Sequence, residues 1–153
     1  MRIETKAYGP MEIDERQLIT FPAGILGFDT LYQYALLDSE RPPFYWLQSL
    51  EKKEVAFILI DPFIFRPDYE TDVPDYELEE LEIESREDVF VFAIVTIPAD
   101  RNRMTANLQG PLIINKKKRI GKQTIANDPR WKIRHDIMEE MKLHGSNNAR
   151  TGS

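Results

Sequence analysis

The sequence predicts a mostly β protein, and its strand spacing favours an all-β barrel or sandwich. We expect a compact β-barrel-like domain of antiparallel strands with one short helix and a C-terminal helix. Short runs rich in β-branched and aromatic residues recur along the first four-fifths of the chain, separated by turn residues that include most of its 10 prolines and 7 glycines. Few gaps between these runs have room for the helices that a βαβ fold requires. At 153 residues, the chain has the length of a single domain.

Each expected strand follows from a local pattern. Residues 2–8 alternate in polarity, and the Gly9-Pro10 pair predicts a turn before a return strand at 11–13. Residues 55–61 and 89–97 are almost continuously apolar, which predicts strands covered on both faces. The remaining expected strands are shorter, and they lie at residues 17–21, 33–37, 44–50, 112–114, 120–121 and 123–126.

Two segments favour helix. Residues 74–81 begin with a proline, which the first turn of a helix tolerates, and they place Leu78 and Leu81 on one face. Residues 129–143 follow Asp128, a good N-cap, and their sparse apolar stripe predicts a loosely attached tail helix. We therefore expect a barrel domain over residues 1–127, a tail helix within 128–144 and a disordered tail over 145–153, which contains no large apolar side chain.

The sequence lacks the residue patterns of common catalytic and cofactor sites. It has no cysteine, its two histidines lie near the C-terminus, and it contains no phosphate-binding loop, HExxH or GxSxG motif. We therefore expect a protein that is not an enzyme and that uses no cofactor and no metal. A run of the roughly 18 apolar residues that a membrane span needs is absent, and so is a signal segment. These absences predict a cytoplasmic protein with no membrane contact.

The net charge of −6 is distributed unevenly. Residues 68–88 contain eleven acidic residues and a single base, Arg86, whereas residues 116–122 contain five bases, from Lys116 to Lys122, and no acid. Each block is typical either of a solvated surface or of an interaction segment, and the sequence alone leaves both interpretations open. As an interaction segment, the acidic block would attract basic partners and repel nucleic acid.

Two further segments also have two interpretations. FPAGILGF at residues 21–28 fits a structural turn, in which glycines supply unusual backbone angles, better than it fits a ligand site. MTANLQGP at residues 104–111 is expected to be a loop between two strands. Its amides, Asn107 and Gln109, would either hold that loop by bonding to backbone groups or contribute to a partner-binding edge.

These two segments, together with PFYWLQS at 43–49 and DPF at 61–63, resemble the signature motifs of the flagellar assembly factor FliW family. The strongest match is TANLQGPLIIN at residues 105–115, and the resemblance covers about residues 1–126. It implies a small cytoplasmic β-barrel-like protein without catalytic activity. It also implies two competing partners, newly made flagellin and the RNA-binding translational regulator CsrA. We expect a monomer when the protein is free, with no direct contact to nucleic acid.

The expected partner contacts fall in three groups. Glu70, Asp72 and Glu77 of the acidic block are expected to face the basic CsrA. Phe63 and Phe65 lie between two prolines that discourage sheet pairing, and two interpretations stay open for them. They are either exposed and bind an apolar helical segment of flagellin, or they cap the barrel as core residues. The third group lies in the motif at 105–111 and consists of Thr105, Asn107, Leu108 and Gln109.

The resulting hypothesis is a cytoplasmic flagellin-binding chaperone and protein antagonist of CsrA, which couples flagellin synthesis to flagellar assembly. The rival hypothesis is a nucleic-acid-binding β-barrel that uses the basic segment from Lys116 to Lys122. Titration of the isolated protein with single-stranded RNA separates the two, because only the rival predicts strong, salt-dependent binding.

Overall fold

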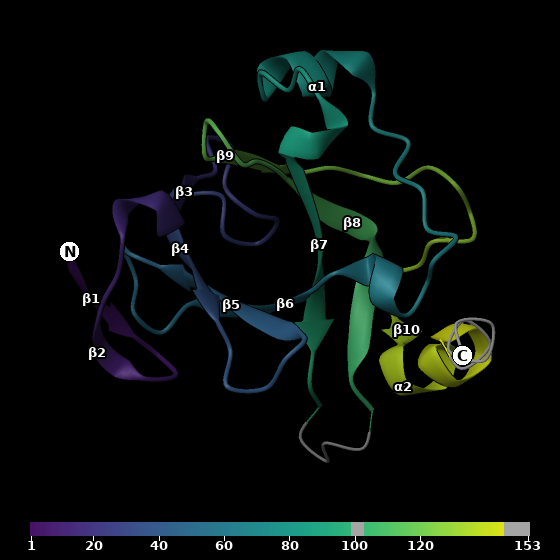
Figure 1. Cartoon of the computed structure of the whole chain (residues 1–153), viewed down its shortest axis with the longest axis horizontal. Helices are drawn as coiled ribbons and strands as arrows, with labels where there is room; N and C mark the ends of the chain where they lie inside the picture. The colour runs from purple at the N-terminus through teal and green to yellow at the C-terminus, as the bar shows by residue number, and fades with distance from the viewer. Residues whose placement is uncertain (99–102, 146–153) are drawn as a thin grey trace.

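A computed structural model describes residues 1–98 and 103–145. Its centre is a closed barrel in which the strands follow the order β8-β7-β6-β5-β4-β3-β9, and β9 pairs back to β8 (Figure 1). Neighbouring strands are antiparallel except β3 and β9, which pair in parallel through Thr20 and Ile120. The barrel strands are β3 (Leu18–Thr20), β4 (Gln33–Asp38), β5 (Phe44–Ser49), β6 (Ala56–Ile60), β7 (Val89–Thr96), β8 (Thr105–Asn115) and β9 (Ile120–Gln123). The predicted fold class is confirmed.

The barrel interior is filled by large side chains from nearly every strand. Phe21, Tyr34, Leu47, Leu59 and Leu112 are all fully buried in one cluster. The next residue along β6 faces the other way, into a second cluster outside the barrel, and β7 shows the same alternation. These two strands are therefore covered on both faces, as their continuous apolar runs predict.

Parts of the outside of the barrel are covered by a hairpin and by a short helix with the chain leading to it. The hairpin of β1 (Arg2–Thr5) and β2 (Gly9–Glu12) packs Ile3 and Ile13 against β4. A short helix, α1 (Asp75–Glu80), and the chain leading to it cover part of β7 and β8. Figure 1 shows α1 standing off one end of the barrel. Short 3₁₀ turns complete the connections: η1 (Glu15–Gln17), η2 (Pro62–Ile64) and η3 (Arg86–Asp88).

The expected loop at 104–111 is wrong, because these residues form the first half of β8. Thr105, Asn107 and Gln109 are half-buried, while Ala106, Leu108 and Gly110 between them are buried, which is the two-residue period of a strand. Both edges of β8 are paired. β7 occupies one edge, while β9 and a two-residue strand, β10 (His135–Asp136), divide the other. Polar residues are tolerated here because the strand's backbone groups are satisfied on both sides.

The expected tail helix over 129–143 is wrong for residues 129–136, whereas the chain is helical from Ile137 onward. Residues 127–136 form a strap along β8 that contains a turn at 128–130, and helix begins at α2 (Ile137–Glu140), which continues into a π-helical turn, η4 (Met141–Gly145). The Lys132 carbonyl accepts hydrogen bonds from the amides of Leu108 and Gln109, and Trp131 is 1% exposed in the outer core cluster. Pairing with β8 has overridden the local helical pattern, and the segment is firmly packed. Residues 146–153 of the expected disordered tail lie outside the described residues.

The burial of Trp131 generates a stability prediction. Trp131→Ala should lower the free energy of unfolding by about 3–5 kcal/mol, because it removes a large core side chain and leaves a cavity. Urea denaturation measures the loss. Ile133→Ala is the matched control from the same strap, since Ile133 is 61% exposed, and it should change stability by no more than about 0.5 kcal/mol. Equal, small effects of both substitutions would show that the strap does not contribute to the folded core.

Candidate partner-binding groove

A groove with a volume of about 800 Å³ lies on the outer face of β7 and β8. Its floor is apolar and includes Val91 and Ile113, which are paired across the two strands. The chain from η2 to α1 forms one wall, and Leu78 and Ile83 extend the apolar lining from α1 and the turn that follows. In Figure 1 this chain runs along the side of the barrel from η2 to α1 before it returns into β7. The groove is therefore built on the rigid sheet but is walled by loop and helix.

Three of the predicted contact residues line this groove. Phe63 in η2 is 43% exposed and stacks obliquely on the Tyr69 ring, with 5.9 Å between the ring centroids. Glu70 and Asp72 are exposed on the wall between η2 and α1. The structure thus brings an aromatic residue expected to meet flagellin and two acids expected to meet CsrA into one cavity.

Two other predicted contact residues are buried and cannot present their side chains to a partner. Phe65 is fully buried in the outer core cluster, because the 3₁₀ turn of η2 points Phe63 outward and Phe65 inward. Glu77 is 8% exposed on the inner side of α1, where its carboxylate accepts a hydrogen bond from the Thr124 hydroxyl and pairs with Lys122 at 3.4 Å. Both expectations of an exposed contact are therefore wrong.

The acidic and basic blocks meet in the fold. Lys122 of β9 lies between Glu77 and Glu80, with 2.8 Å from its ammonium nitrogen to the Glu80 carboxylate. That hydrogen bond raises the pKa of Lys122. Lys117 similarly lies 3.5 Å from Asp88. Part of the charge of each block is thus neutralised within the molecule. The groove acids Glu70 and Asp72, in contrast, form no ion pair with another described residue.

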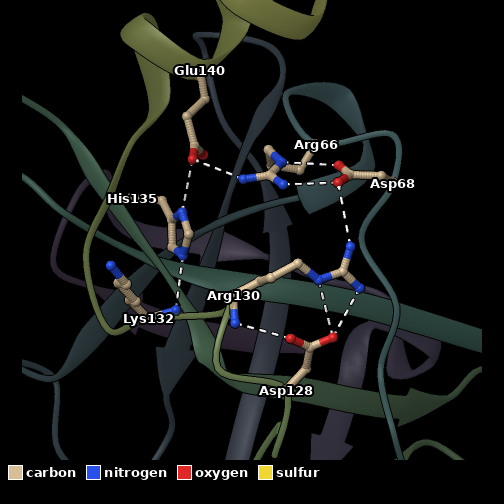
Figure 2. Close-up of polar contacts among 7 residues, drawn as sticks. All are labelled: Arg66, Asp68, Asp128, Arg130, Lys132, His135 and Glu140. Atoms are coloured by element: carbon tan, nitrogen blue, oxygen red, sulfur yellow. Dashed lines mark hydrogen bonds and ion pairs between the residues drawn. The ribbon is translucent and has the colours of Figure 1, made fainter.

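A network of charged side chains fixes the strap to the wall of the groove (Figure 2). Arg66 binds Asp68 through two hydrogen bonds of 2.9 and 2.8 Å, and its third nitrogen donates to Glu140 of α2 at 3.1 Å. The hydrogen bonds from Arg66 lower the pKa of Asp68 to about 2. The guanidinium groups of Arg66 and Arg130 lie 4.8 and 4.7 Å from the centroid of the Trp131 ring.

The histidine in this network has a structural role. The His135 Nε2 atom accepts the backbone N–H of Lys132 at 2.8 Å, and Nδ1 faces the Glu140 carboxylate, also at 2.8 Å. An Nε2 that accepts and an Nδ1 that donates define a neutral imidazole with its proton on Nδ1. His135 is buried, and both nitrogens are occupied. It therefore closes the turn of the strap and is not positioned for acid–base chemistry.

Within residues 1–98 and 103–145, no three or more His, Asp or Glu side chains gather in a way that could hold a metal ion. Over the same residues, no helix has the length and apolar character to cross a bilayer.

Known proteins share both the sequence and the fold. The profile of the FliW protein family matches residues 2–137. The flagellar assembly factor FliW of Treponema denticola is 51% identical over 147 residues, covering 96% of this chain and 100% of that protein. The chain belongs to the FliW family. The corresponding protein of Treponema pallidum is 48% identical over 141 residues, covering 92% and 94% of the two chains. A crystal structure of the flagellar assembly factor FliW matches with a TM-score of 0.82 at 39% identity, covering 90% of this chain and 96% of that one.

The FliW motif at 21–28 is a structural turn, as its glycines predict. Gly24 and Gly27 have positive φ angles of 71° and 87°. A Cβ on Gly24 would lie 2.6 Å from the backbone of Asp29, so no larger residue fits there. Phe21 and Ile25 are buried, whereas Phe28 is partly exposed and packs edge-on against Phe57.

The first half of the FliW motif at 105–115 lies beside the strap, whereas Ile113 in its second half lines the floor of the groove. Leu108 is fully buried, so it cannot be a partner contact in this fold. Asn107 Oδ1 accepts hydrogen bonds from the amides of Gln109 and Gly110, at 3.0 and 2.9 Å. Thr105 faces Asp136 of β10 across the ladder. These contacts support the interpretation in which the motif is held to backbone groups, and a partner role for Thr105, Asn107 and Gln109 stays a prediction.

The contacts of Asn107 predict a structural defect on substitution. Asn107→Ala should destabilise the protein by about 1–3 kcal/mol, because two partly buried amides lose a hydrogen-bond acceptor. Thermal and urea unfolding measure the effect. Asn107→Asp, which keeps the acceptor oxygen, is the matched control and should lose less. If both variants unfold like the parent, the motif has some role other than holding the strand.

The pairing of Asp68 predicts a pH dependence. The pKa of Asp68 is lower in the folded protein, about 2, than its ordinary value of 3.8, so its contribution to stability is present above about pH 4 and disappears as the pH falls through about 2. Asp68→Asn should therefore lower the free energy of unfolding at pH 7, and the difference from the parent should shrink below about pH 4 and vanish only as the pH falls below 2. Urea titrations across this range measure it, with Asp29→Asn as an exposed control. A difference that stays constant with pH would contradict the assignment.

Proposed function

We propose that this protein is a non-catalytic flagellar assembly factor that binds flagellin and the translational regulator CsrA in the groove, one partner at a time. The observation that carries the proposal is the convergence of Phe63, Glu70 and Asp72 on one cavity. The relatives in Treponema bear the name of flagellar assembly factors, which supports a role in the same process. By binding CsrA only when flagellin is absent, the protein would couple flagellin synthesis to flagellar assembly.

The apolar part of the groove fits a chaperone for flagellin. A protein that shields an assembly segment must cover the apolar stripe of that segment, as in helix-in-groove recognition. Phe63 offers an exposed ring at the edge of the cavity, and Val91 and the buried Ile113 give the cavity an apolar floor.

The acidic part of the groove fits a basic RNA-binding protein. Carboxylates with no ion-pair partner attract a basic surface and speed its association. The same charges repel RNA, so a bound CsrA molecule would be shielded from its RNA targets on this side. Placing both partners on one groove explains competition directly, since occupancy by either one excludes the other.

The rival nucleic-acid hypothesis is weakened by the pairing of the basic segment. Lys122 is held by Glu77 and Glu80, and Lys117 lies against Asp88. Phosphates would have to displace these carboxylates to bind Lys117 or Lys122. The folded arrangement thus leaves less free positive charge than the sequence block suggests.

A capture experiment with purified flagellin and purified CsrA tests the proposal. Phe63→Ser should weaken flagellin binding by about tenfold or more, as expected when an anchor side chain is lost. The double variant Glu70→Gln with Asp72→Asn should slow CsrA association, mainly at low salt. Saturating flagellin should release CsrA from the parent protein.

The chain offers matched controls for both changes. Ile64→Ser alters the neighbour of Phe63, which is similarly exposed but does not line the groove. Glu79→Gln with Glu84→Gln removes the same charge from exposed residues outside the groove. Controls that lose as much binding as the groove variants, or a stable complex holding flagellin and CsrA together, would overturn the shared groove.

A further inference from the structure

The charges of the groove are divided between its elements. Glu70, Asp72 and Asp75 enter from the wall segment and the start of α1, whereas Arg86 is the one base among the lining residues and comes from η3. None of the four forms an ion pair with another described residue. Elsewhere in the acidic block, Asp68, Glu77, Glu80 and Asp88 are all neutralised by bases of this chain. The groove therefore keeps unpaired charges of both signs around an apolar floor.

We infer that the groove accepts one amphipathic peptide segment whose apolar side chains lie on the floor and whose Lys or Arg residues face Glu70, Asp72 and Asp75. Arg86 repels a basic residue of the segment at the η3 end of the groove. It therefore favours segments that are neutral or acidic at that end, and this preference determines the direction in which the segment lies. This inference rests on the proposed function, and it specifies the chemistry of the segment that both partners would present.

The charges of the groove exclude the other common occupants. A phosphate backbone or an acidic peptide would face Asp72 and Asp75, which have no ion-pair partner among the described residues, and Glu70, whose charge Arg130 partly offsets; bringing like charges together is unfavourable at an interface. An uncharged apolar segment would leave those carboxylates partly desolvated without a partner, which is also unfavourable. A basic amphipathic segment would cover the apolar floor with its apolar side chains and pair its basic side chains with the carboxylates of the wall.

The chain itself carries one short sequence of this kind. Ile133 is exposed on the strap between Lys132 and Arg134, which are also exposed. A second copy could present these residues to the groove, so the test includes self-association as an outcome. We commit to a partner segment, because three strap residues supply only one apolar side chain for a floor that spans β7 and β8.

Synthetic peptides of 14 residues, built from Leu and Lys at helical spacing, provide the probe. A matched peptide with Glu in place of Lys reverses the charge, and two further peptides replace the terminal Lys by Glu at one end or the other. Calorimetric titration of the full chain at low and physiological salt gives the affinities. We expect binding of the Lys peptide, no measurable binding of the Glu peptide, and preference for one of the two end-substituted peptides over the other.

Variants then locate the site. Glu70→Gln with Asp72→Asn should weaken the Lys peptide by about tenfold, while Glu79→Gln with Glu84→Gln should change its affinity by less than about twofold. Arg86→Glu should tighten the Lys peptide several-fold and remove the preference between the end-substituted peptides. Arg2→Glu makes the same charge change on β1, outside the groove lining. It should change neither the affinity of the Lys peptide nor the preference between the end-substituted peptides. Circular dichroism confirms that each variant is folded.

Several results would overturn the inference. These are equal binding of the Glu peptide, equal losses in the groove and control pairs, or an unchanged preference in Arg86→Glu. Concentration-dependent dimerisation that Ile133→Ser abolishes would assign the groove to a second copy. If the peptides fail while flagellin and CsrA still bind in a Phe63-dependent manner, only this inference fails. If the peptides bind as expected while neither protein binds, the proposed function fails instead.

Discussion

Strand β8 is hydrogen-bonded along both of its edges, and the rest of the structure depends on this double pairing. β7 follows one edge over nearly its full length, and β9 follows the other only from Leu112 onward. The first half of that second edge would be left open without the strap, which supplies β10 and the Lys132 carbonyl. Because buried backbone groups need hydrogen-bond partners, the first half of β8 depends on the C-terminal strap for its pairing.

The groove exists because the outer face of β7 and β8 is covered in two different ways. The strap packs tightly over the first half of β8 through Trp131, and the network of Arg66, Asp68 and Glu140 holds it there. Over the other half, the chain from η2 to α1 arches across Val91 and Ile113 without filling the space below. One side chain network thus stabilises the strap and anchors the start of the groove wall.

The distribution of ion pairs separates structural acids from surface acids. Glu77 is neutralised on the inner side of α1, where it ties the helix to β9 through Lys122 and Thr124. Its neighbours on the groove side keep their charge. This division lets one acidic block both hold α1 in place and present a negative wall to the groove.

The sequence by itself determined the barrel class, the position of α1, the glycine turn at 21–28 and, through its motifs, the family. These features depend on local patterns, namely alternation, turn residues and short signatures. The sequence also predicted partner contacts for Phe63, Glu70 and Asp72, which stay predictions, and only the tertiary structure brought these residues into one groove. The fold alone decided that Phe65 and Glu77 are buried and that residues 129–136 form a strap along β8 instead of a helix. A local pattern determines which residues of a segment are polar and which are apolar. Whether those residues are buried depends on contacts with residues far away in the chain, such as Thr124 with Glu77 and β8 with the strap.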